Sequence, residues 1–433
     1  MTDTVDVIVV GGGFGGLTAA RELAHHGRRV LLLEGRDRIG GRTWTTPFAG
    51  VEVEMGGAWV HWFQAHVWSE ITRYGLEIED DDEPERCAWI SGGHLMEVSP
   101  EELGASLDAA WRSYARDARD LLPRPAELLW SDALANVDRL SQQDRLSEID
   151  LEPEVRDLFG GLLSTGASAP NAEAGLVHGG LKGFALAAYD PALVAETNGG
   201  YRITTGTRSL VEAIANDGGV EIRLSTPAAR VAQDRGGVTV ATRTGETHRA
   251  QAAVIAVPLN ALGAIEFDPP LSEGKRAMVD EGHAGRGAKV WLRARGEVAP
   301  FIGIAPDDHP LTFLETAQRV DGDTLLIGFG PRGDVLDPAN RAALEAAVHA
   351  FLPDARIEEI GGHPWHADEY SFGTWCVFRP GQITRYLRDL QEPEERLLLA
   401  GSDLASGWVG WIDGAIESGL RAAREIERML SST

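Results

Sequence analysis

Residues 5–35 read VDVIVVGGGFGGLTAARELAHHGRRVLLLEG, and this stretch decides the fold. An apolar strand runs directly into a cluster of glycines, a helix with a small apolar face follows, and a second apolar strand ends at Glu34. In such a unit Gly11 permits the tight turn, Gly13 lets a ligand approach the backbone, and Gly16 allows the helix to pack closely on the strand. The order of elements predicts a Rossmann-like α/β fold.

The same unit predicts a dinucleotide site. A diphosphate would lie at the N-terminus of the helix, where free N–H groups and the helix dipole favour negative charge. Glu34 is placed to accept hydrogen bonds from ribose hydroxyls and disfavours a 2′-phosphate, so the cofactor is expected to be NAD or FAD. The residues of this loop assigned to the cofactor site are Gly11, Gly13, Phe14, Gly15 and Gly16.

Two further glycine-rich turns distinguish between these cofactors. GRDRIGGRTWT (35–45) brings a second glycine pair, and VEVEMGGAWVHW (51–62) brings a short strand and a third turn. An NAD site does not need these extra close approaches of backbone, whereas the longer FAD molecule does, so the pattern favours FAD. The residues added to the expected cofactor site are Arg36, Gly41, Arg42, Gly56, Gly57, Ala58 and Trp59.

Four segments carry a resemblance to a known family. GGGFGGLTAARELAHHGRRVLLLEGRDRIGGRTWT (11–45) resembles the signature of the flavin monoamine oxidase family, and AGSDLASGWVGWIDGAIESGLRAAREI (400–426) resembles its closing flavin segment. GAKVWLRARG (287–296) and GTWCVFRPGQ (373–382) stand between them in the family's order. The resemblance covers essentially the whole chain and leans toward bacterial members such as 6-hydroxynicotine oxidases.

The resemblance implies a fold class: α/β, with a Rossmann-like FAD-binding domain interleaved with an α+β substrate domain, as in amine oxidases and glutathione reductase. It assigns residues 1–80, 204–263 and 388–433 to the FAD-binding domain. The substrate-binding domain takes residues 81–203 and 264–387, with a helical part at about 99–185.

Three local patterns predict particular elements. Ser99-Pro100-Glu101-Glu102 is a capping box with proline in the first turn, so a helix is expected to begin there. RCAWISGGHLMEV (86–98) predicts a hairpin that turns at Ser91-Gly92-Gly93. The last 20 or so residues have apolar side chains at three- and four-residue spacings, which indicates a terminal helix that begins near Ile412.

The resemblance also implies how the flavin is held. The backbone of Val231 would meet the adenine end, and Asp403 matches the acidic residue that binds the ribityl chain, although Glu is more usual there. The positive end of the terminal helix would face the flavin's pyrimidine edge, with Gly410, Trp411, Ile412 and Ala415 beside the ring. Some members attach FAD through a cysteine. Alignment puts Gly373 at that position, so the FAD is expected to be non-covalent.

Three residues are the candidates for catalysis. Lys289 interrupts the apolar strand AKVWLRA. An inward lysine would have a lowered pKa and could hold a water, whereas on a simple alternating strand it would face solvent. In the family the lysine at this position contacts flavin N5 through water. Trp375 and Trp411 match the paired aromatic residues that form a slot for a neutral amine, the alternative being that both are core tryptophans.

Four residues are weaker candidates for the pocket wall: Ser164, Phe313, Glu315 and Cys376. Glu315 could bind a second amino group of a diamine, or could be an ordinary surface carboxylate. Cys376 is read as a small pocket or core residue.

The function implied by the resemblance is FAD-dependent oxidation of an amine. Hydride passes from the α-carbon to flavin N5, the imine is hydrolysed, and dioxygen is reduced to hydrogen peroxide. Two alternatives stay open: a flavin dehydrogenase or desaturase that uses a protein or quinone acceptor, and a flavin-binding protein without turnover.

Composition limits the partners and the location. The 433 residues carry 40 Lys and Arg against 66 Asp and Glu, a net charge of −26, which disfavours nucleic acid. Two cysteines make neither a disulfide framework nor a metal-spaced cluster, so no metal is expected. The sequence has no signal-peptide pattern and no run of about 18 apolar residues, which predicts a cytoplasmic protein without membrane contact. A homodimer is expected by analogy alone.

Overall fold

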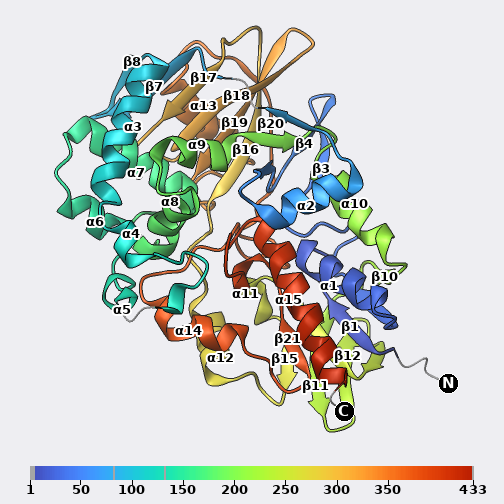
Figure 1. Ribbon diagram of the computed structural model, residues 1–433. Helices are drawn as coiled ribbons and strands as arrows, with labels where there is room; N and C mark the ends of the chain where they lie inside the picture. The colour runs from blue at the N-terminus through green and yellow to red at the C-terminus, as the bar shows by residue number, and fades with distance from the viewer. Residues whose placement is uncertain (1–4, 81–82, 131–132, 432–433) are drawn as a thin grey trace.

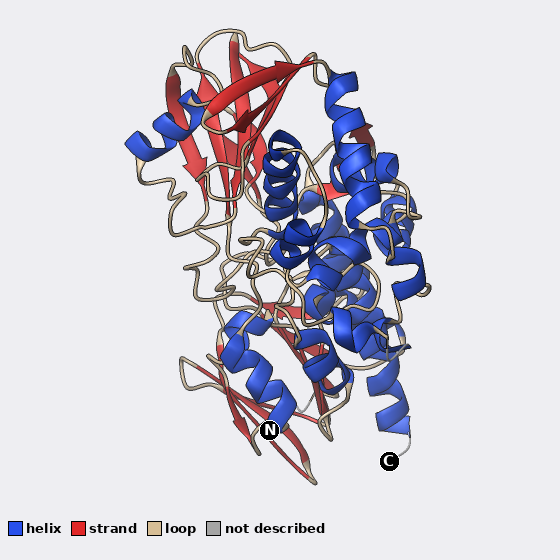
Figure 2. Cartoon of the chain, turned by 90° about the vertical axis from the view of Figure 1, so that its left-hand side faces the viewer, coloured by secondary structure: helices blue, strands red, loops and turns tan. Residues whose placement is uncertain are grey.

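The computed structural model describes residues 5–80, 83–130 and 133–431. Figure 1 shows two sheet-based parts, one above the other: a large sheet flanked by helices at the top, and a parallel sheet covered by α1 and α15 at the bottom. Seen from the side, strands gather at the two ends of the molecule and helices run along one side of it (Figure 2).

The lower part contains a parallel sheet with the strand order β10-β2-β1-β14-β21. Its central strands β1, β2 and β14 are short runs of Ala, Val, Ile and Leu that are buried at every residue, as expected for strands covered on both faces. The five strands of the sheet are β1 (Val7–Val10), β2 (Val30–Leu33), β10 (Glu221–Arg223), β14 (Ala252–Ile255) and β21 (Leu397–Leu399).

Three helices cover this sheet on one side. They are α1 (Phe14–His25), α10 (Thr207–Asp217) and α15 (Ile412–Ser431). Figure 1 shows α15 lying alongside α1, and the two helices touch where a Cβ on Gly419 would lie 2.4 Å from the Gly15 carbonyl oxygen. The predicted strand–turn–helix–strand unit and the predicted terminal helix are therefore confirmed.

The upper part is built on a sheet with the order β20-β16-β19-β18-β17-β7-β8. Its strands are β7 (Arg86–Ser91), β8 (His94–Val98), β16 (Ala288–Ala294), β17 (Phe301–Ile304), β18 (Phe313–Val320), β19 (Asp323–Gly330) and β20 (Ile357–Gly362). β7 and β8 form the predicted hairpin, since Ser91 pairs with His94. One helix on this sheet, α13 (Arg341–His349), follows β19 in the chain.

Smaller sheets complete the strand content of the described residues. They are β13-β12-β11-β15, β3-β4 and β5-β9-β6. The strands are β3 (Thr45–Phe48), β4 (Val51–Glu54), β5 (Trp59–Val60), β6 (Ile78–Asp80), β9 (Tyr201–Ile203), β11 (Ala228–Asp234), β12 (Gly237–Thr242), β13 (Thr247–Ala250) and β15 (Glu266–Asp268).

A group of helices stands beside the upper sheet. Its first helix, α3, begins with the predicted capping box: the Ser99 side chain accepts from the Glu102 N–H, and the Glu102 side chain accepts from the Ser99 N–H. The helices are α3 (Pro100–Tyr114), α4 (Ala118–Leu121), α5 (Leu134–Val137), α6 (Gln142–Glu148), α7 (Pro153–Ala167), α8 (Lys182–Leu186) and α9 (Pro191–Gly199), with short helices η1 (Leu128–Trp130) and η2 (Val177–Leu181).

The remaining helices join these parts. They are α2 (Ala65–Tyr74), α11 (Leu259–Leu262), α12 (Glu273–Glu281), α14 (Gln382–Gln391) and η3 (Ser402–Leu404). The lower sheet draws strands from 1–80, 204–263 and 388–433, the three segments assigned to the FAD-binding domain. However, β15 lies in the segment 264–387, which was assigned to the substrate-binding domain, and it pairs with β11 of the FAD-binding segments. The two predicted domains therefore share one small sheet. The domain boundaries stay a prediction, as do the dimer and the cytoplasmic location.

Within residues 5–80, 83–130 and 133–431, no helix combines the length and the apolar character that crossing a bilayer requires.

Candidate active site

One cavity of about 1090 Å³ is lined by residues from both parts of the molecule. β1, β2 and α15 contribute to it from the lower part, and β16 to β19 contribute from the upper part. It is lined by most of the residues predicted to hold the cofactor: Gly11, Gly13, Phe14, Gly15, Glu34, Arg36, Gly41, Arg42, Gly56, Gly57, Ala58, Trp59, Asp403, Gly410, Trp411, Ile412 and Ala415.

The glycine loop after β1 forms a narrow cradle in this cavity. Gly13 is the N-cap of α1 and has no side chain to cap it, so the first turn of the helix presents backbone N–H groups to the cavity. Gly41 faces Gly13, and a Cβ added to Gly41 would lie 3.3 Å from the Gly13 α-carbon. A side chain at either position would fill the space between the loops, which is the space that a diphosphate needs.

Glu34 directly follows β2 beside this cradle. Its carboxylate accepts hydrogen bonds from the Gly12 N–H (2.6 Å) and from the Arg36 N–H (2.7 Å), and the residue is 4% exposed. The two bonds fix the carboxylate at the edge of the cavity, and the unused lone pairs can accept from ribose hydroxyls.

Two predicted cofactor residues do not line the cavity. Gly16 lies behind the loop, where a Cβ would come within 2.0 Å of the Gly11 carbonyl oxygen, so its contribution is close packing. Val231 is fully buried in β11. Pro227 and Ala228, just before it, line the cavity instead. The adenine contact of Val231 stays a prediction.

Arg42 and Asp403 form an ion pair at the wall of the cavity. The Arg42 guanidinium donates to Asp403 Oδ1 (2.5 Å), and Asp403 Oδ2 accepts from the Leu259 N–H (3.0 Å). Burial opposes ionisation of Asp403, but Arg42, His283 and the Leu259 N–H together outweigh it and hold the pKa of this carboxyl below its usual value. Arg42 also donates to the Thr374 carbonyl oxygen (2.7 Å), so it ties the closing segment to the segment that carries Trp375.

Trp375 and Trp411 both line the cavity, and each is half-buried. The indole N–H of Trp375 donates to the Gly166 carbonyl oxygen (2.9 Å). The Trp411 ring meets the edge of Trp408 at 5.8 Å. Trp408 itself is 6% exposed and donates to the Phe63 carbonyl oxygen, so of the two tryptophans before α15 one packs the interior and the other faces the cavity.

Lys289 points inward from β16. Its side chain is 4% exposed, which rules out the solvent-facing alternative, and it lines the cavity. Its Nζ donates to the Gly56 carbonyl oxygen (3.1 Å) and lies 4.7 Å from the centroid of the Trp59 ring. The Lys289 amino group is therefore held between the third glycine-rich turn and aromatic faces.

Three of the four weaker pocket candidates line the cavity. Phe313, Glu315 and Cys376 line the cavity, whereas Ser164 does not. Ser164 is fully buried within α7, where its hydroxyl donates to the Gly161 carbonyl oxygen (3.0 Å). Its neighbours Leu163 and Thr165 reach the cavity instead.

The segment around Cys376 bears on how FAD is attached. Thr374 lines the cavity, whereas Gly373, expected at the attachment position, does not. Neither residue can form the thioether bond that some family members have. Cys376 is buried, and burial raises the pKa of its thiol well above the usual value, so the thiol stays protonated and unreactive.

Several lining residues were missed by the sequence interpretation. α3 supplies Leu103, Leu107 and Trp111, and α9 faces them with Val194 and Ala195. A helical apolar stripe predicts a buried face, but it does not say that part of that face borders a cavity. The loop after β20 supplies Trp365, Glu369 and Tyr370, for which no motif in the sequence gave a signal.

The cavity as a whole fits FAD. It offers a glycine cradle at an uncapped helix N-terminus, an acid at the end of β2, and space that continues past Asp403 to Trp411 and Lys289. FAD is the group that would place a diphosphate at the first of these and a flavin at the last.

Comparison with known proteins agrees with FAD as the cofactor. Residues 14–427 match the family described as flavin containing amine oxidoreductase. The chain is 39% identical over 433 residues to pseudooxynicotine dehydrogenase of a Pseudomonas species, covering 98% of this chain and 86% of the relative. It is 29% identical over 430 residues to (S)-6-hydroxynicotine oxidase of Paenarthrobacter nicotinovorans, covering 95% and 97%. Putrescine oxidase bound to putrescine has the same fold, with a TM-score of 0.85 and 23% identity over 99% of this chain and 100% of that chain.

These findings confirm the predicted resemblance and the predicted cofactor. The family match begins at Phe14, the first residue of α1, and extends to residue 427, so it covers Lys289 and the closing segment together. The chain belongs to the flavin-containing amine oxidoreductase family and is an FAD enzyme that acts on amine donors.

Proposed function

We propose that this enzyme oxidises the carbon–nitrogen bond of a nicotine-type amine, in which a basic nitrogen is joined to an aromatic ring through one or more carbon atoms. The observation that carries the proposal is a single cavity lined both by the FAD cradle and by Lys289, Trp375 and Trp411. The names of the two relatives described above, pseudooxynicotine dehydrogenase and 6-hydroxynicotine oxidase, support this substrate class.

FAD supplies the chemistry when bound, because it accepts hydride from the carbon next to the nitrogen. The chain supplies the arrangement. Trp375 and Trp411 present indole surfaces that hold an uncharged amine, and the hydrogen bond from Trp375 to Gly166 fixes one of them. Lys289, held by the Gly56 carbonyl oxygen, positions a proton donor beside the same space.

The wall beyond the two tryptophans suits an aromatic substituent. Phe313 from β18 and Phe329 from β19 line it with their rings 6.1 Å apart, and Leu103 and Leu107 of α3 extend the apolar surface. An aryl ring bound there loses water-exposed apolar area, which favours arylalkyl amines over short, fully aliphatic ones.

The electron acceptor has two candidates. Reduction of dioxygen to hydrogen peroxide is the first, as in a relative named as an oxidase. Transfer to another acceptor is the second, and it is favoured by the dehydrogenase at 39% identity.

One experiment tests all of these points. The purified yellow protein is mixed without air with nicotine, 6-hydroxynicotine, pseudooxynicotine, putrescine and cyclohexylamine, and loss of the flavin absorbance is followed. We expect bleaching with a nicotine-type amine. Air is then admitted and peroxide is measured: fast return of colour with peroxide indicates the oxidase, and slow return that an artificial acceptor speeds up indicates the dehydrogenase. Absence of bleaching by every amine would overturn the proposal and favour a flavin-binding role without turnover.

A further inference from the structure

We propose that Arg36, Arg243, Glu369 and Tyr370 form an adenosine clasp, anchored by Asp368, that closes over the adenosine half of FAD and controls its release. The clasp joins the lower part of the molecule to the loop that follows β20 in the upper part. Retention of the cofactor would then depend on residues outside the glycine cradle.

The location of the clasp follows from Glu34. The ribose of a dinucleotide lies at this acid, so the adenine lies beyond it. There the cavity is lined by Pro227, Ala228, Arg243, Glu369 and Tyr370. The chain before Pro227 is bonded directly to this edge, since the Thr226 N–H donates to the Glu34 carbonyl oxygen (2.8 Å). The clasp residues and the ribose acid therefore border one compartment.

Tyr370 is the central side chain of the clasp. Its ring lies against Gly35, where an added Cβ would come within 2.6 Å of the ring. The guanidinium carbons of Arg36 and Arg243 lie 5.2 and 5.6 Å from the ring centroid. A phenol ring held by two cations at the edge of a cavity offers a surface for a purine base, because aromatic side chains stack on bases.

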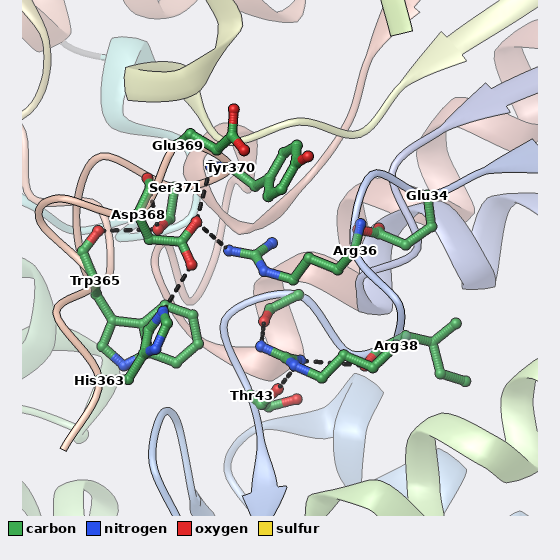
Figure 3. Close-up of polar contacts among 12 residues, drawn as sticks. Glu34, Arg36, Arg38, Thr43, His363, Trp365, Asp368, Glu369, Tyr370 and Ser371 are labelled. Carbon is green, nitrogen blue, oxygen red and sulfur yellow. Dashed lines mark hydrogen bonds and ion pairs between the residues drawn. The ribbon is translucent and has the colours of Figure 1, made fainter. Parts of the chain in front are cut away.

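Asp368 fixes this arrangement (Figure 3). Its Oδ1 accepts from the Arg36 guanidinium (2.7 Å) and from the Tyr370 N–H (2.8 Å), and its Oδ2 bonds to the His363 ring (2.6 Å). The Arg36 and Asp368 side chains are only 11% and 12% exposed. Asp368 does not line the cavity, so it acts as a positioning residue for Arg36 and Tyr370.

The outer half of the clasp is weaker. Glu369 accepts from Arg243 (2.5 Å), but their side chains are 54% and 38% exposed. Ion pairs this exposed contribute between nothing and about 1 kcal/mol, so this pair can open without unfolding the protein. A firm anchor at Asp368 beside a weak outer pair is the arrangement expected of a closure through which a cofactor exchanges.

The test measures cofactor release from the holoenzyme. FAD release after dilution is followed by flavin fluorescence for Tyr370→Leu, Glu369→Gln and Asp368→Asn. The control is Glu345→Gln, which removes the same charge from an exposed ion pair with Arg341 on α13, outside the cavity lining. We expect the rate of FAD release, and with it the Kd for FAD, to rise about tenfold in Tyr370→Leu. The same two quantities should rise about two- to fivefold in Glu369→Gln. Asp368→Asn should resemble Tyr370→Leu, and Glu345→Gln should match the wild type.

Fragments of FAD separate a clasp from a general loosening. ADP carries the adenosine half alone, and its inhibition constant against FAD binding to the apoprotein should rise about as much as the Kd for FAD. The thermal unfolding midpoints of the Tyr370→Leu and Glu369→Gln apoproteins should stay at that of Glu345→Gln. The proposal is overturned if Tyr370→Leu releases FAD no faster than the control, if competition by ADP is unchanged, or if the apoprotein of each clasp variant is destabilised as much as its holoprotein.

Discussion

Gly410 packs directly on the backbone of Cys376: a Cβ added to Gly410 would lie 3.0 Å from the Cys376 carbonyl oxygen and 3.3 Å from the Trp375 Cβ. Gly410 precedes Trp411, and Cys376 follows Trp375. The two segments that carry the cavity tryptophans therefore touch through one glycine, and the separation of the two indoles depends on this contact.

Gly410→Ala should disturb this separation. Gly410 has a φ of +85°, so alanine would pay about 1–2 kcal/mol in backbone strain as well as pushing on Cys376. We expect flavin reduction by the best amine of the panel to slow at least about tenfold, measured by anaerobic stopped-flow absorbance. The matched control is Gly296→Ala, since Gly296 has a φ of +79° but nothing within 4 Å of an added Cβ. Equal slowing in both variants would mean that strain alone, and not the contact, is responsible.

Lys289→Met should separate catalysis from cofactor binding. Methionine keeps the apolar stem among Trp59 and its neighbours but loses the ammonium group that donates to Gly56. We expect FAD content to stay at the wild-type level while flavin reduction or reoxidation slows by an order of magnitude or more. Lys275→Met, which removes a buried lysine that pairs with Glu394 outside the cavity lining, is the control. Unchanged rates in both half-reactions would remove Lys289 from the mechanism.

Lys182 should make stability rise with pH. Its side chain is 2% exposed and donates to the Ser406 carbonyl oxygen (2.9 Å), and burial lowers its pKa to about 7 from 10.5. Between these values the unfolded chain holds a proton at this amine that the folded chain has released, so the free energy of unfolding increases with pH. Urea unfolding at pH 7 to 9 should show this increase in the wild type and a smaller one in Lys182→Met. An equal increase of the unfolding free energy with pH in the wild type and in Lys182→Met would contradict this role of Lys182.

Asp403 should make the stability of the protein depend on pH in the acidic range. Its folded pKa lies below the usual 3.8 because Arg42, His283 and the Leu259 N–H together outweigh burial, so its stabilisation is present above pH 4 and is lost as pH falls through the folded pKa. Asp403→Asn leaves Arg42 without this partner, and breaking such a pair costs about 3–5 kcal/mol at neutral pH. The difference in unfolding free energy from the wild type should shrink as pH is lowered from 7 toward 3. A difference that does not change with pH would refute this account.

The flavin should leave the protein when it unfolds. No cysteine stands at Gly373 or Thr374, and the Cys376 thiol is kept protonated by burial. After acid precipitation we expect all of the yellow colour in the supernatant. A yellow pellet would show a covalent link.

The sequence predicted the elements whose signals are local. The loop from Gly11 to Gly16, the Ser99 capping box and the β7–β8 hairpin each depend on a few neighbouring residues, so their patterns can be read from the chain alone. Residues brought in from a distance were harder to foresee. Tyr370 meets Gly35 only after the sheet has formed, and nothing in its own neighbourhood indicates this contact.

Side-chain direction was the other reason why predicted site residues and cavity-lining residues differ. Ser164 and Thr165 are neighbours on α7, yet only Thr165 reaches the cavity, because successive helical residues point about 100° apart. Ala228, at the start of the strand β11, lines the cavity, whereas Val231, three residues later on the same strand, does not. A motif fixes the segment more readily than it fixes which side chain of the segment faces the ligand.

The order of strands in the lower sheet has a consequence for biosynthesis. β1 is synthesised before β14, with which it pairs, and the sheet ends at β21, which follows β14 in the chain and precedes α15. The nucleotide pocket therefore stays incomplete on the growing polypeptide until the segment from β21 to α15 has been synthesised. Cofactor capture follows that step, and nascent chains interrupted before it would be left without the cofactor and open to proteolysis.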